Sequence, residues 1–70
     1  MSKTQAIILS KEFFTEMEAE KWIMFHRYHP IKPVHETKQY YRFRLENPRD
    51  FSHFITKEIE DGVKLIIGFY

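Results

Sequence analysis

The sequence contains no cysteine and only two glycines and three prolines among its 70 residues. The lack of cysteine excludes a disulfide framework, cysteine-ligated zinc and thiol catalysis. With two glycines there is no glycine-rich phosphate loop. The apolar run 7–9 is far too short to span a membrane and is not followed by a signal-peptide cleavage site, so we expect a soluble protein in the cytoplasm.

An excess of charge of either sign is also missing. Eleven Lys and Arg residues against ten Asp and Glu leave a formal net charge of +1, and the pI is about 8.0. Proteins that grip an extended duplex usually have a pI above about 9 and a clearly basic face. Binding of long nucleic acid is therefore disfavoured, whereas a local pocket for a small anion is compatible with this balance.

Aromatic residues, by contrast, are abundant, with seven Phe, four Tyr and one Trp. A domain of this size buries roughly 60% of the surface that its unfolded chain exposes, so most of these rings must form its one thin core. Such a core supplies only about 3–5 kcal/mol of stability. We therefore expect a single domain over residues 1–70 that forms homo-oligomers.

The first part of the chain predicts a strand and then a helix. Residues 4–9 include a short apolar run typical of a buried strand. Thr15 and Glu18 have the spacing of a capping box, and the helix is expected to continue to about Tyr28, since the residue before Pro30 disfavours the helical conformation. Two apolar stripes would cover this helix nearly all round, one of Ala19, Trp22, Ile23 and His26 and the other of Met17, Met24, Phe25 and Tyr28.

After an extended connector over residues 29–37, alternation over residues 38–46 predicts the clearest strand. It places Tyr41, Phe43 and Leu45 on one face and Tyr40, Arg42 and Arg44 on the other. Asn47 and Pro48 end that strand and begin a helical turn. Residues 63–69 predict a last strand, in which Gly68 indicates a bulge or a close backbone approach.

Residues 52–59 fit two structures. Phe51, Phe54, Ile55 and Ile59 would line one side of a helix, whereas Asp61-Gly62 favours a β-hairpin. The predicted fold class is α+β, a small, mainly antiparallel sheet packed on one long helix. Its element order is β-α-β-β-β, or β-α-β-α-β if residues 49–60 are helical.

A set of motifs spans nearly the whole chain, and they are Phe14-Thr15, Ala19, Trp22-Ile23, His26, Tyr28, Glu36-Thr37, the segment 40–44, Pro48, Phe51, Phe54, Thr56 and the segment 61–68. In this order they resemble a small module of tailed-phage XkdF-type and prohead-protease-associated proteins. Arg27 and Ile55 depart from the module, which has a turning glycine and an arginine there. The resemblance implies a phage origin, a compact α+β unit and no catalytic residue, and it favours a strand over residues 52–59.

Tyr40, Arg42 and Arg44, with Lys64 beside them on the last strand, form the candidate ligand-binding site. Guanidinium groups offer paired donors to phosphate or carboxylate oxygens, and tyrosine rings stack on bases. The alternative is a solvated face on which the arginines pair with Glu36, Glu46 or Glu58. Trp22 and His26, one helical turn apart, would form either a stacking shelf for a ligand or part of the core.

The other candidate sites carry weaker patterns. His26, His29, His35 and His53 do not have the spacing of a metal motif. Asp50, Ser52 and His53 have the residue types of a hydrolase but no oxyanion site. We therefore expect no metal, no cofactor and no enzymatic activity.

Two functions remain as predictions. One is a phage-type binding protein in the infected host that holds an anionic small ligand, such as a nucleotide signal of host defence. The other is a protein-protein interaction module of phage head assembly, in which the same residues contact a host or phage protein.

Overall fold

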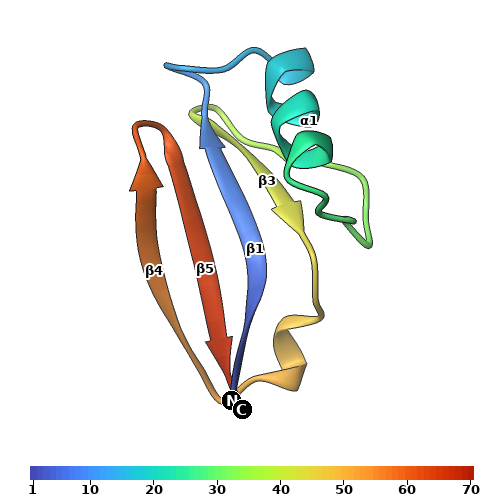
Figure 1. The fold of residues 1–70 in the computed structure, drawn as a ribbon, viewed down its shortest axis with the longest axis vertical. Coiled ribbons are helices and arrows are strands. Elements are labelled where there is room, and N and C mark those ends of the chain that lie inside the picture. Colours follow the sequence, from blue (N-terminus) through green and yellow to red (C-terminus); the bar gives the residue numbers. More distant parts are fainter.

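The first strand of the chain lies at the centre of a five-stranded antiparallel sheet (Figure 1). This strand, β1 (Ser2–Ser10), pairs with β3 (Tyr40–Arg44) on one side and with β5 (Val63–Phe69) on the other. The edges are β2 (His35–Glu36) and β4 (His53–Glu60), which gives the order β2-β3-β1-β5-β4. The computed structural model describes all 70 residues, and the predicted α+β class is confirmed.

The single helix, α1 (Glu16–Phe25), has ten residues. Its predicted capping box is present, because the Glu18 amide donates to the Thr15 hydroxyl and the Thr15 amide donates to the Glu18 carboxylate. The prediction of a long helix that continues to about Tyr28 is wrong.

The helix ends early because the chain turns through Arg27, whose φ is 62°. The Arg27 amide donates to the Met24 carbonyl, and the Tyr28 amide donates to the Ile23 carbonyl. These two bonds form a Schellman motif, which usually has glycine at the left-handed position. Because arginine rarely takes this conformation, the residue type gave no local signal of a helix end, and the prediction extended the helix to about Tyr28.

The helix covers one face of the sheet, and the core lies between them. The buried side chains of this core alternate along the strands as expected, and they are Ile7, Leu9, Tyr41, Phe43, Leu45 and Val63, with Ala19 and Ile23 from the helix. Of the two predicted helix stripes, the one with Ala19 and Ile23 is buried in part, while Met17, Met24 and Phe25 of the other are exposed. One helix therefore closes only one face of the sheet.

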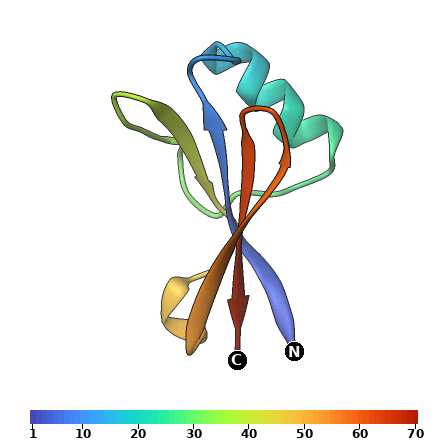
Figure 2. The same cartoon turned by 90° about the vertical axis from the view of Figure 1, so that its left-hand side faces the viewer.

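The opposite face is covered only in its lower half (Figure 2). Asn47 caps the short 3₁₀ helix η1 (Pro48–Asp50), as predicted. Just after it, Phe51 packs on Gly68 so closely that a Cβ on this glycine would lie 2.4 Å from the ring. The close backbone approach predicted at Gly68 is thus confirmed.

Residues 53–60 form a strand that pairs with β5. Of the two structures predicted for this segment, the β-hairpin is therefore the one observed. Gly62, with φ of 82°, supplies the left-handed turn residue between β4 and β5. The element order differs from the predicted one by the extra strand β2 within the connector.

The two chain ends lie side by side, and the Tyr70 amide donates to the Met1 carbonyl (Figure 1). No helix of this structure combines the length and the apolarity that crossing a membrane requires.

Candidate anion-binding site

The sheet face opposite α1 carries a row of side chains that crosses all five strands. The pairing registers set Glu58 opposite Lys64, Lys64 opposite Ile8, Ile8 opposite Arg42, and Arg42 opposite His35. Directly opposite residues of antiparallel strands share one face. Three potentially cationic side chains therefore lie in one row, whose only carboxylate is at the β4 end.

Tyr40 and Arg44 flank this row on the same face. Tyr40 is opposite Ser10, and Arg44 is opposite Ala6. Since residues two apart in a strand are about 6.6 Å apart along it, the guanidinium groups of Arg42 and Arg44 are near enough to contact one ligand. The prediction that Tyr40, Arg42, Arg44 and Lys64 share one face of the sheet is confirmed.

A hollow of about 200 Å³ lies at the two arginines. Its lining consists of Arg42, Arg44, Lys32, Pro33 and His35, without a carboxylate. The Ile31 amide donates to the Arg44 carbonyl, which holds the connector with Lys32 beside β3. We call these five residues the basic hollow.

Neither arginine of the basic hollow is tied to another side chain. The structure has one salt bridge, between Lys11 and Glu36, so the predicted pairing of the arginines with Glu36, Glu46 or Glu58 on a solvated face is absent. The Arg42 Nε atom is shielded from solvent and has no hydrogen-bond partner. A shielded donor without an acceptor is costly.

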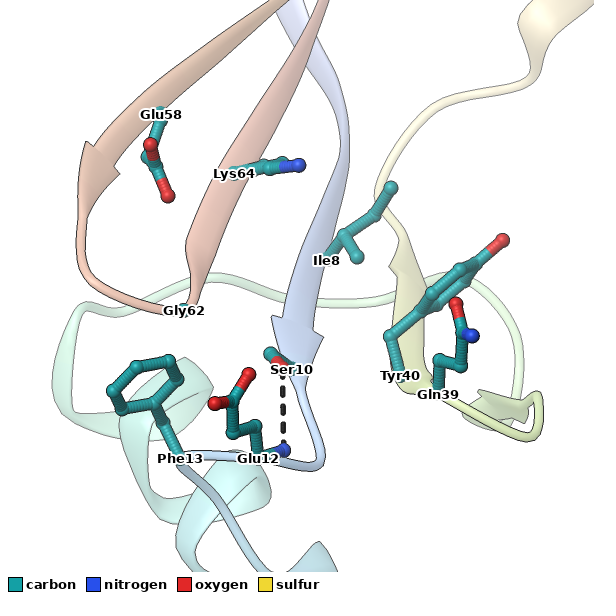
Figure 3. Close-up of a pocket in the computed structure, with 9 residues that line it drawn as sticks. All are labelled: Ile8, Ser10, Glu12, Phe13, Gln39, Tyr40, Glu58, Gly62 and Lys64. Atoms are coloured by element: carbon teal, nitrogen blue, oxygen red, sulfur yellow. Dashed lines mark hydrogen bonds between the residues drawn. The ribbon is translucent and has the colours of Figure 1, made fainter.

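Tyr40 and Lys64 line a separate hollow of about 280 Å³ at the end of this face where β4 turns into β5 at Gly62 (Figure 3). Ile8 lies between them, and Glu12 and Glu58 contribute carboxylates to the same lining. In Figure 3 the Lys64 side chain extends from β5 toward β1. The predicted set is thus divided, with the two arginines in a hollow without acidic residues and Tyr40 and Lys64 in one of mixed charge.

Trp22 and His26 lie on the helix, on the other side of the sheet. Their rings stack with centroids 3.8 Å apart, and the Trp22 indole N–H donates to the Glu60 carboxylate at 2.8 Å. Trp22 packs against the core, whereas His26 is exposed. Trp22 thus follows the predicted core alternative, and His26 stacks on it from outside. The sheet separates both rings from the arginines.

Lys32 and His35 were missing from the predicted site. Their place beside the arginines depends on the two-residue strand β2 and on one backbone hydrogen bond of the connector. A pairing this short leaves no periodic pattern in the sequence. No sequence signal could have identified these two residues.

Of the residues considered for catalysis, Ser52 and His53 are in contact, with the Ser52 Oγ atom 3.2 Å from His53 Nδ1. The Ser52 hydroxyl also donates to the Phe69 carbonyl at 3.0 Å, and Asp50 makes no hydrogen bond to His53. The structure contains no cluster of three or more His, Asp or Glu side chains that could hold a metal ion.

Comparisons with known proteins add no assignment. No protein-family model, curated protein or solved structure matches this chain. The resemblance to XkdF-type phage proteins therefore stays a prediction.

Proposed function

We propose that this protein is a non-enzymatic binding protein that holds a small phosphate-bearing anion in the basic hollow. The observation that carries the proposal is that Arg42 and Arg44 lie unpaired in a hollow shared with Lys32 and His35 and free of carboxylates. Paired guanidinium donors match phosphate oxygens in geometry and in charge.

The size and charge of the site favour a small ligand. The basic hollow, at about 200 Å³, has room for a phosphate or pyrophosphate group, and the whole chain carries a net charge of only +1. A long duplex would need phosphate contacts over a much wider basic surface. We therefore propose a nucleotide-type ligand, bound by its phosphates, in the cytoplasm of a phage-infected host, where its capture would counter a defence signal.

A second candidate function is a protein-protein interaction module, as the resemblance to head-assembly proteins implies. It is favoured by the outer side of α1, where Met24 is 75% and Phe25 is 83% exposed. Exposed apolar patches of this kind mark contacts with other proteins. On this proposal the helix is the contact surface and the basic hollow has no small ligand.

Thermal unfolding with phosphate, pyrophosphate and a panel of nucleotides tests the first proposal. A ligand present at 100 times its Kd stabilises the fold by about 2.7 kcal/mol, so we expect a clear rise in melting temperature. The double substitution Arg42→Ala, Arg44→Ala should abolish that rise without unfolding the protein.

Arg49→Ala is the matched control, because Arg49 is an exposed arginine on η1, outside the basic hollow. It should leave the ligand-induced rise unchanged. A melting temperature that no anion of the panel raises would overturn the anion proposal and leave the interaction module.

A further inference from the structure

Strand β4 is a long, unprotected edge of the sheet. It pairs only with β5 and forms the outer border of the sheet in Figure 1. All eight of its residues are exposed, among them Phe54 at 42% and Ile55 at 48%. An edge strand presents unpaired backbone N–H and C=O groups, which form a template for a further strand.

The opposite edge strand, β2, has features that prevent edge-to-edge pairing. There β2 has only two residues, and Pro33 and Lys38 flank it in the sequence. Short length, proline and lysine are common means of blocking edge-to-edge pairing. In β4 there is no proline, its single lysine is Lys57, and its one irregularity lies between Glu58 and Glu60, at the hairpin end. The two edges are thus built differently.

We infer that β4 pairs antiparallel with β4 of a second copy of this chain, so that two five-stranded sheets join into one ten-stranded sheet. A core this thin makes self-association an expectation, and this inference goes beyond the proposed anion binding by naming its surface. A two-fold axis perpendicular to the sheet brings the same strand of each copy together and closes the assembly at two copies.

Charge selects the register of this pairing. A two-fold axis perpendicular to the sheet leaves every side chain on its own face, and directly opposite residues of antiparallel strands point to the same face. Because neighbours in a strand point to opposite faces, the axis must set one residue opposite its own copy. The midpoint of β4 lies between Thr56 and Lys57. An axis at Lys57 would place two ammonium groups face to face, which is destabilising, whereas an axis at Thr56 joins two hydroxyl side chains.

The register centred on Thr56 also suits the neighbouring positions. It places Ile55 opposite Lys57 of the second copy, and the aliphatic stem of a lysine covers apolar surface. It places Phe54 opposite Glu58 of the second copy, so that no two like charges lie directly opposite each other. It also sets the helix-bearing end of each copy beside the helix-free end of the other.

The molar mass in solution, measured by light scattering after size-exclusion chromatography, tests the inference. We expect twice the mass of the chain for the wild type and the single mass for Thr56→Lys, which sets two lysines against each other at the axis. Thr56 is exposed, so the substitution should leave the single chain folded, with one cooperative thermal unfolding transition.

Phe25→Lys is the matched control, since it introduces the same charge at the most exposed apolar position of α1. It should retain the double mass. A single mass for the wild type, or a dimer that Phe25→Lys dissociates and Thr56→Lys does not, overturns the inference.

A cross-link gives an independent readout, because the chain has no cysteine of its own. Opposite Cα atoms of paired antiparallel strands lie about 4.5–5.5 Å apart, a distance that a disulfide can span. Thr56→Cys should form a disulfide-linked dimer upon mild oxidation, and Glu20→Cys, exposed on the helix, should stay a monomer.

The absence of a cross-link in Thr56→Cys would overturn the proposed register. The double variant Arg42→Ala, Arg44→Ala should dimerise like the wild type. Failure of the anion proposal and failure of this inference are therefore distinguished by different variants.

Discussion

Ile7 and Ile8 are neighbours in β1 and have opposite surroundings. Ile7 points toward α1 and is completely buried, while Ile8 lies on the other face, between Lys64 and Arg42 in register, and is half-buried. With a single ten-residue helix, the chain can close one face of its sheet. The other face, closed below by Phe51 and open above, is where charged side chains gather.

The largest expected effect on stability comes from replacing each of these two isoleucines by alanine in a separate variant. Ile7→Ala leaves a cavity in the core and should lower the free energy of unfolding by about 2–5 kcal/mol. Ile8→Ala, the matched control, removes a half-buried side chain and should cost about 1 kcal/mol. Urea unfolding of both variants measures the difference, and equal losses would show that the two faces are equally packed.

A smaller effect is expected on the lower half of the open face. In Gly68→Ala the new Cβ would overlap the Phe51 ring, so the ring must move, and the free energy of unfolding should fall by about 1–3 kcal/mol. If this overlap is the cause, the double variant with Phe51→Ala should be less destabilised than the sum of the two single variants. Additive losses from urea unfolding would place the cause elsewhere.

The smallest effect concerns the start of the helix that closes the other face. A hydrogen bond from the Thr15 amide lowers the pKa of the Glu18 carboxyl below its usual 4.5, and the Thr15 hydroxyl lowers this pKa further, by a smaller amount. A pKa lowered by folding means stability that is complete above the unfolded-state value and is lost as the pH falls through the folded-state value. The wild type should therefore lose more stability than Glu18→Gln when the pH falls from neutral to below 4.5.

Urea unfolding at the two pH values measures this difference. Glu20→Gln is the matched control, because Glu20 lies exposed on the same helix and makes no hydrogen bond. An identical pH dependence in the wild type and in Glu18→Gln would contradict the role of this capping carboxylate.

Much of the sheet was predictable because alternation and turn residues are local signals. The two faces of β3, the cap at Thr15, the helical turn after Asn47 and the turn at Gly62 all follow from neighbouring residues. Helix length was not predictable, since Arg27 adopts the left-handed conformation without the usual glycine. Local rules fail where a residue takes a conformation that its type disfavours.

The candidate site was predictable only in part, for a related reason. Arg42 and Arg44 share a face by strand periodicity, which the sequence contains. The division of the predicted set into two hollows depends on the strand order. The separation of Trp22 and His26 from the two arginines depends on the side of the sheet that α1 covers. Such long-range placement leaves no mark at the residues themselves.

The meeting of the two chain ends has a consequence for how this fold is reached. Since β5, the last strand, is inserted between β1 and β4, β4 cannot join the rest of the sheet before residues 63–69 are synthesised. Pairing between sequence-distant strands delays folding because loop closure must precede the contacts. A ribosome-bound chain short of that point would hold only β1, β2 and β3 as sheet partners, with β4 unpaired, so we expect the full sheet to form in one late step.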